Sequence, residues 1–159
     1  MTATRKKSEP TPADAPSLAL EEFFPYRLAM LSNRVSGAIA STYATRFGLS
    51  IPEWRIMAIL GRHPDLSARE VVERTMMDKV TVSRAVARLL AKRRLARAVD
   101  GLDRRRSVLR LSSAGERVYR EIVPFALAKE RVLLDALTPS ERRALDRLLA
   151  TLSRAAERL

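Results

Sequence analysis

The sequence predicts a mainly α-helical protein that carries one small β-hairpin of two or three strands. Apolar residues recur every three or four positions over most of the chain, which is the helical period. Ser50, Ser67 and Thr138 each stand three residues before a glutamate, a pattern typical of helix starts. Leu95–Val99 and Val108–Leu111 are short runs rich in aliphatic residues on either side of a loop, as in a β-hairpin.

The amino-acid composition restricts the classes of partner and of chemistry that the chain can have. The chain has 159 residues, which suits one domain or a small module with a helical extension. Its formal charge of +12 indicates a polyanionic partner, with nucleic acid ahead of an anionic membrane. Cysteine is absent, which excludes disulfides, thiol catalysis and thiolate zinc sites, and no cofactor or metal is expected. With no membrane-length apolar run and no signal segment, we expect a cytoplasmic protein.

The first 48 residues contain an arm and a long helix. Residues 1–17 are rich in Pro, Ala, Ser and Thr and are expected to be disordered, either as a solvated tail or as an arm that touches DNA phosphates. Residues 18–48 then predict one helix from Leu20 with Gly48 as its stop. Its apolar face consists of Phe24, Leu28, Leu31, Val35, Ile39, Tyr43 and Phe47.

Residues 49–112 predict three helices followed by the hairpin. The helix after Ser50 has proline in its first turn and ends near Pro64, and a short helix runs from Ser67 through Thr75. Asp78 then caps a longer helix, and two helices joined by a short turn suggest a helix-turn-helix. The buried face of this longer helix is expected to hold Val80, Val82, Ala85, Val86, Leu89 and Leu90.

The C-terminal part, residues 113–159, predicts two further helices. The first spans about Gly115 to Leu137 and should be kinked by Pro124. The last begins at Thr138 and carries an apolar stripe, Leu145, Leu148, Leu149, Leu152, Ala156 and Leu159, beside a dense arginine face. Because such a stripe needs a partner surface, the first and last helices are predicted to form a homodimer interface, with an intrachain core as the alternative.

The most basic stretch carries the predicted function. From Ser67 to Ser112 there are 13 Lys and Arg against 5 Asp and Glu, a net charge of +8. In a helix-turn-helix, the start of the second helix meets base edges in the major groove, and here that start holds Lys79, Thr81, Val82, Ser83 and Arg84. A solvated basic face is the alternative. Later residues are placed for phosphate contact: Arg88, Lys92, Arg93 and Arg94.

The hairpin loop favours the DNA-binding interpretation. Asp103, Arg104, Arg105 and Arg106 lie in this loop, where a carboxylate can hold a neighbouring arginine extended. An ordered cation there suits the narrow minor groove of A·T-rich DNA, and Ser67 completes the expected contacts. One His and no Gly-rich phosphate loop argue against an enzyme, and no aromatic platform favours RNA. A sequence-independent architectural DNA binder remains the alternative to a regulator.

From Leu20 to Leu159 the chain resembles the MarR family of winged helix-turn-helix regulators. The resemblance rests on DKVTVSRAVARLLAKRRL, DRRRSVLRLSSAG and LTPSE, and on the wing pattern Asp-x-Arg followed by Leu-Thr-x-x-Gly. Here that pattern is Asp103, Arg105, Leu111, Ser112 and Gly115. It implies that Arg105 enters the minor groove, that Asp103 orients it, and that a homodimer binds a pseudo-palindromic operator. Arg94 stands where the family usually has a helix-ending glycine.

The resemblance also implies a small-molecule effector between the dimer helices and the DNA-binding lobe. Its apolar wall would hold Phe24, Leu28, Tyr43, Trp54, Met57 and Phe125, and its polar groups would be Arg34, Ser36 and His63. Core packing is the alternative for each aromatic, and capping or surface exposure for His63. The first two helices resemble CouR-type repressors of hydroxycinnamate catabolism, which implies a repressor released by an aromatic acyl-CoA such as p-coumaroyl-CoA. An unconjugated aromatic acid competes with it.

Overall fold

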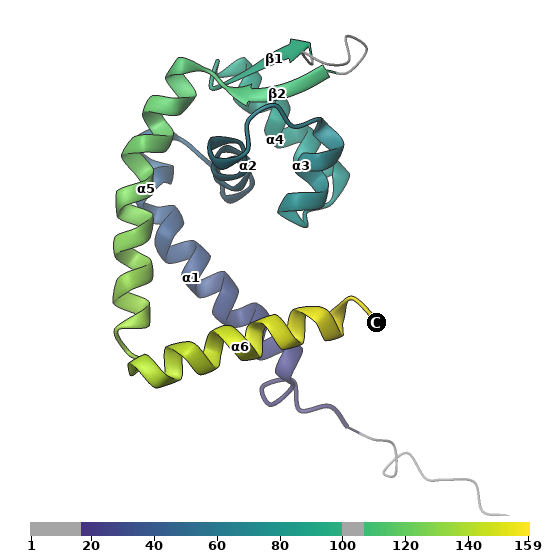
Figure 1. Ribbon diagram of the computed structural model, residues 1–159, viewed down its shortest axis with the longest axis vertical. Coiled ribbons are helices and arrows are strands. Elements are labelled where there is room, and N and C mark those ends of the chain that lie inside the picture. The colour runs from purple at the N-terminus through teal and green to yellow at the C-terminus, as the bar shows by residue number, and fades with distance from the viewer. Residues whose placement is uncertain (1–16, 100–106) are drawn as a thin grey trace, which may run out of the picture. The chain divides into compact units, whose positions relative to one another are not determined.

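The computed structural model describes residues 17–99 and 107–159, which form two units that divide after Val35. Helix α1 (Phe24–Phe47) begins in the first unit and ends in the second. The second unit continues through α2 (Ile51–Arg62), α3 (Ala68–Thr75), α4 (Lys79–Ala91), β1 (Leu95–Val99), β2 (Ser107–Leu111), α5 (Ser113–Leu134) and α6 (Pro139–Ala156) (Figure 1). The predicted fold class, mainly helical with a small β-wing, is confirmed.

The helix starts follow the capping signals in the sequence. The Ser50 amide donates to the Glu53 carboxylate at 2.7 Å, and the Glu53 amide donates back to the Ser50 hydroxyl at 3.4 Å. The same reciprocal pair occurs at Ser67 and before α6 at Thr138. Each box satisfies backbone donors that a helix start would leave unpaired, so all three predicted starts are confirmed.

The core of the second unit lies where α2 packs against α3, α4, α5 and β2. Ile56 and Met57 of α2, Val71 of α3 and Leu89 of α4 are completely buried in this core. Val82, Ala85 and Val86 are also buried, but Val80 is 57% exposed, so its predicted place in the buried face is wrong. Two positions along a helix turn the side chain by about 200°, so Val80 and Val82 point to nearly opposite sides.

The wing is an antiparallel pair in which Leu95 lies opposite Leu111 and Val99 opposite Ser107. On the other edge of β2, the Leu109 amide donates to the Leu66 carbonyl at 2.7 Å. Leu66 lies in the connection between α2 and α3, and this single-residue bridge is all that the described residues show of a third strand. The wing is therefore attached directly to the helix-turn-helix.

A close junction joins α4, the wing and α5. The helix-ending left-handed residue is Arg93 (φ +53°), one position before the expected Arg94, and the Arg94 amide donates to the Leu89 carbonyl at 2.8 Å. The Ser112 amide donates to the Arg94 carbonyl at 3.0 Å, and its hydroxyl donates to the Arg93 carbonyl at 2.6 Å. A Cβ on Gly115 would lie 2.0 Å from the Arg94 carbonyl oxygen, so only glycine fits there.

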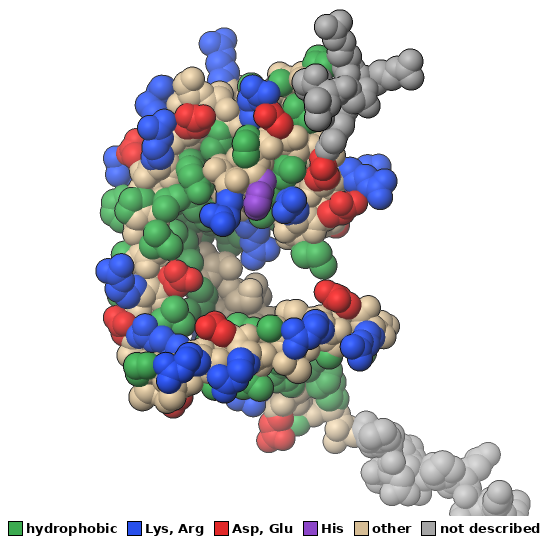
Figure 2. Space-filling view, viewed as in Figure 1, with side chains coloured by type: hydrophobic (Ala, Val, Ile, Leu, Met, Phe, Trp, Pro, Cys, Tyr) green, Lys and Arg blue, Asp and Glu red, His purple; other side chains and the backbone are tan. Residues whose placement is uncertain are grey.

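Three helices expose apolar side chains. Within the first unit these include Phe24 (52%) and Leu31 (55%) of α1. Within the second, α5 exposes Val132 (71%) and α6 exposes Leu148 (60%), and none of the 18 residues of α6 is buried. Figure 2 shows hydrophobic side chains at the surface along α5 and a row of Lys and Arg along α6. None of the described helices has the length and apolarity needed to cross a membrane.

Candidate nucleic-acid interface

The first turns of α4 present a basic surface. Lys79, Ser83, Arg84 and Arg88 are all exposed. They occur at helical spacing, so they share one side of α4, opposite the side that packs on the core. Val82 does not belong to this surface: it is 1% exposed, so its predicted contact with base edges is wrong.

The start of α4 is fixed by Asp78. Its carboxylate accepts the Thr81 amide at 2.8 Å and the Thr81 hydroxyl at 2.5 Å. These bonds hold the pKa of Asp78 below its usual value, so the carboxyl group is ionised at neutral pH. Its negative charge interacts favourably with the positive end of the α4 dipole. The Thr81 hydroxyl already donates its hydrogen bond to the Asp78 cap, and the Thr81 side chain is half-buried.

Lys92 does not extend the exposed basic surface. Its ammonium donates to the Gly48 carbonyl at 2.8 Å and to the buried Glu53 carboxylate at 2.9 Å. Burial alone would raise the pKa of Glu53, but hydrogen bonds from Ser50 and Lys92 outweigh it and lower that pKa. A phosphate contact by Lys92, as predicted, would compete with these bonds, through which the side chain links the end of α4 to the start of α2.

The other predicted DNA contacts have different surroundings. Arg93 is exposed, whereas Arg94 is half-buried, and its Nη1 is buried without a hydrogen-bond partner among the described residues. The Ser67 hydroxyl donates to Glu70 within the α3 cap at 2.7 Å, so its proton is already used. Asp103, Arg104, Arg105 and Arg106 lie outside the described residues, although both strands that lead to them are described.

The predicted effector residues are only partly brought together. Tyr43 and Trp54 lie 5.6 Å apart between ring centroids, and Tyr119 of α5 continues this row at 6.0 Å from Trp54. Tyr43 and Met57 are at most 1% exposed and belong to the core, and burial raises the pKa of the Tyr43 hydroxyl. Sequence reasoning missed Tyr119, although its spacing of three from Ile122 places it on the apolar side of α5.

The remaining predicted effector residues are scattered. His63 is the C-cap residue of α2, where its amide donates to the Ile59 carbonyl, as expected for a capping role. Ser36 of α1 is half-buried, and Phe125 of α5 is 47% exposed. In the first unit Phe24, Leu28 and Arg34 are exposed. Phe24 and Leu28 therefore form no closed pocket wall within that unit.

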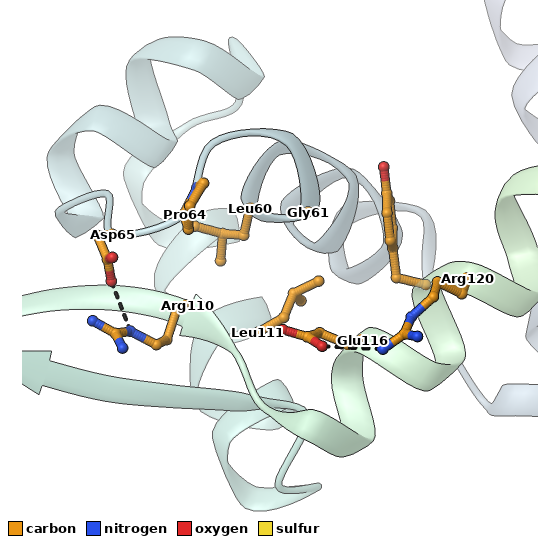
Figure 3. A pocket seen from close by; sticks show the side chains of 9 residues that line it. Leu60, Gly61, Pro64, Asp65, Arg110, Leu111, Glu116 and Arg120 are labelled. Carbon is orange, nitrogen blue, oxygen red and sulfur yellow. Dashed lines mark hydrogen bonds and ion pairs between the residues drawn. The ribbon is translucent and has the colours of Figure 1, made fainter.

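A cavity of about 430 Å³ lies between the end of α2, strand β2 and the start of α5 (Figure 3). Two ion pairs flank it, Asp65 with Arg110 at 2.7 Å and Glu116 with Arg120 at 3.2 Å. Tyr119, Leu60 and Leu111 supply its apolar lining, and none of the predicted effector residues lines it. Within residues 17–99 and 107–159, no three carboxylate or imidazole groups gather in a way that could hold a metal ion.

The comparisons agree with this geometry. The sequence pattern of the MarR family matches residues 47–106, which run from the end of α1 through the helix-turn-helix into the wing. The chain also superimposes on a MarR/EmrR family transcriptional regulator from Acinetobacter sp. ADP1 with a TM-score of 0.81 and 25% identity, over 89% of this chain and 100% of that one. Residues 47–106 thus match the MarR family, and the fold of the chain is similar to that of a MarR/EmrR family regulator. Members of this family are DNA-binding transcription regulators and not enzymes.

Two further solved structures are similar over nearly their whole length. The PcaV regulator from Streptomyces coelicolor, solved with its natural ligand, is 26% identical with a TM-score of 0.73, over 89% of this chain and 99% of that one. BpsR from Bordetella bronchiseptica, whose DNA binding is regulated by 6-hydroxynicotinic acid, is 27% identical with a TM-score of 0.74, over 87% and 98%. No curated protein sequence matches this chain.

Proposed function

We propose that this protein is a homodimeric repressor that leaves its operator when it binds an aromatic acid or the CoA thioester of one. The observation that carries the proposal is the exposed basic side of α4, held in place by the Asp78 cap and the Lys92 brace, next to a wing with three consecutive arginines. A helix and a wing placed in this way fit the major and the adjacent minor groove of one DNA half-site.

The proposed contacts follow the exposed residues. Lys79, Ser83 and Arg84 would meet base edges, because they stand at the start of α4. Arg88 near the end of α4 and Arg93 just after it would meet phosphates. In the wing, Arg105 would enter the minor groove with Asp103 beside it, and Arg104 and Arg106 would add phosphate contacts.

The dimer is proposed from the exposed apolar faces of α1, α5 and α6. Each of these helices exposes several large apolar side chains, and a second copy is the economical cover for them. Two copies related by a twofold axis would present two α4 helices to a pseudo-palindromic operator, with half-sites about one helical turn apart.

The effector class is proposed from two similar proteins. BpsR responds in its DNA binding to 6-hydroxynicotinic acid, which is an aromatic acid, and PcaV was solved with a natural ligand. In this chain the half-buried Trp54 and the exposed Phe125 are candidate apolar contacts, with Ser36 and His63 as polar ones. Effector binding would shift the population toward a state with a different spacing of the two α4 helices, which lowers operator affinity.

The DNA-binding proposal is tested by titrating an operator with arginine variants. Arg105→Ala and Arg84→Ala are each expected to weaken operator binding about tenfold or more, with the dimer intact. Arg117→Ala is the matched control, since Arg117 is an exposed arginine of α5. Unchanged operator affinity in either test variant would remove that residue from the interface.

Two measurements test the regulatory part. A repressor binds its operator far more tightly than a random duplex at the same salt concentration, whereas an architectural protein binds both alike. A thermal-shift screen with aromatic acids and their CoA thioesters, followed by release from the operator, tests the effector. Stabilisation without release would contradict the repressor mechanism, and no stabilisation by any of them would contradict the aromatic effector.

A further inference from the structure

Val80 is an exposed aliphatic side chain in the middle of the basic surface of α4. It is 57% exposed and is the only large apolar residue of this helix at the surface. Lys79 precedes it, and Ser83 and Arg84 follow one turn later on the same side. The α4 side chains that pack inside the lobe, Val82, Ala85, Val86 and Leu89, lie on the opposite side.

Nothing within the described chain covers Val80. It is absent from the core cluster and from the residues packed against that cluster. A valine contributes little to helix formation, because its branched side chain is restricted in a helix, so helical propensity does not account for it at this position. Its position next to Lys79 and Arg84 means that whatever polyanion these cations bind also meets Val80.

The major groove of DNA offers one apolar group, the C5-methyl of thymine. Thr81 also carries a methyl group near the start of α4, but its side chain is half-buried and its hydroxyl is held by Asp78 at 2.5 Å. The Val80 side chain is 57% exposed and is not held by a neighbouring residue of the described chain. We infer that Val80 is a specificity-determining residue that packs on the C5-methyl of one thymine in each half-site of the operator.

This inference rests on the proposed function, because it requires α4 to lie in the major groove. It adds a base preference that the charged residues cannot supply. Arg84 and Lys79 favour the acceptors of guanine, whereas Val80 distinguishes thymine from cytosine and from uracil. Burying one methyl group against Val80 is expected to tighten binding about fourfold for each half-site.

The experiment removes the methyl group from the DNA and its partner from the protein. An operator is first selected by the full-length protein from a pool of random duplexes. Each thymine is then replaced singly by deoxyuridine, which differs from thymidine only by the missing methyl group. Affinities are measured for the wild type, for Val80→Ala and for Lys79→Ala as the matched control.

The expected result is one thymine in each half-site at which deoxyuridine weakens wild-type binding about fourfold but leaves Val80→Ala unaffected. Lys79→Ala should weaken binding to every duplex and keep the full methyl effect. Because Val80 is exposed, Val80→Ala should retain the unfolding temperature of the wild type.

Two outcomes overturn the inference. One is that no single methyl group affects binding, and the other is that Val80→Ala keeps the methyl effect. In either case, a loss of operator binding in Arg84→Ala would leave the proposed function standing. If the protein selects no duplex at all, the proposed function fails as well.

Discussion

Glu53 is the one charged side chain that the described residues bury, and its position depends on a lysine 39 residues later. Its carboxylate closes the α2 cap through Ser50 and also accepts the Lys92 ammonium, which binds Gly48 at the end of α1 as well. Three elements therefore meet at one ion pair. Sequence patterns predicted the cap, since Ser50 and Glu53 are close in the chain, but not the lysine.

Lys92→Met tests this pair. Methionine keeps most of the side-chain stem but leaves the Glu53 carboxylate without its cation, so the free energy of unfolding should fall by about 2 kcal/mol at neutral pH, a value reduced for the partial exposure of Lys92. Chemical denaturation measures this change. Lys129→Met, at an exposed lysine of α5, should have the stability of the wild type.

The deficit of Lys92→Met should depend on pH. Because the pKa of Glu53 is lowered in the folded protein, the pair contributes stability above the ordinary carboxyl value of 4.5 and loses it as the pH falls through the folded pKa. The stability difference between wild type and variant should therefore be largest near neutral pH and shrink in acid. A difference that grows in acid would contradict the pairing.

Single side chains show where sequence periodicity was insufficient. Val80 and Val82 are both aliphatic and two positions apart, and both were predicted to lie in the buried face, with Val82 also predicted to contact base edges. Val82 is buried, whereas Val80 is exposed. Within one turn, the hydrophobic pattern fixes the helix but leaves the angle of its buried face uncertain. That angle is set by α2 and α3, which pack on α4 from elsewhere in the chain.

At the scale of elements, the sequence predicted most of what the structure contains. Capping boxes act over three residues and a hairpin over a few more, so the starts of α2, α3 and α6 and both strands were located closely. The bridge between Leu66 and Leu109 was not foreseen, because it joins residues 43 positions apart that carry no pattern of their own. The junction at Arg94 was not foreseen for the same reason, because it joins residues that are distant in the chain through their backbone atoms.

Gly115→Ala tests that junction. Its Cβ would lie 2.0 Å from the Arg94 carbonyl oxygen, a backbone atom that cannot turn aside, so the wing and α5 must separate. We expect a loss of about 3 kcal/mol in the free energy of unfolding. Gly37→Ala is the matched control: this helical glycine has open space around it, and alanine there should raise stability by about 0.5 kcal/mol. Equal effects of the two substitutions on urea unfolding would refute the close contact.

At the scale of the whole molecule, the apolar stripe of α6 was predicted from the sequence, and its cover by a second copy stays a prediction. Leu148, Leu149 and Leu152 are each at least 42% exposed, as expected for a face that lacks its partner in a single chain. The hydrophobic pattern of a sequence identifies an apolar face of a helix, but it does not identify the surface that packs against this face. The aromatic row Tyr43–Trp54–Tyr119 raises the same difficulty, since core packing and ligand contact select the same residues.

Charged substitutions in α6 test the proposed dimer. Leu148→Asp combined with Leu152→Asp should give a monomer in sedimentation velocity, because two carboxylates would be buried without partners at the interface. Operator affinity should fall more than tenfold, since one half-site no longer assists the other. Arg143→Asp, at an exposed position of the same helix, should remain dimeric. A dimer that survives the leucine changes would place the interface away from α6.

The single bond between the Leu109 amide and the Leu66 carbonyl also constrains the order of folding. The β1–β2 hairpin closes within 17 residues, from Leu95 to Leu111, so its own pairing is a local event. Its attachment to Leu66 requires the connection between α2 and α3 to be in place, which costs the entropy of closing a much longer loop. The wing can therefore pair early in folding, but it acquires its final direction only after the helices have packed.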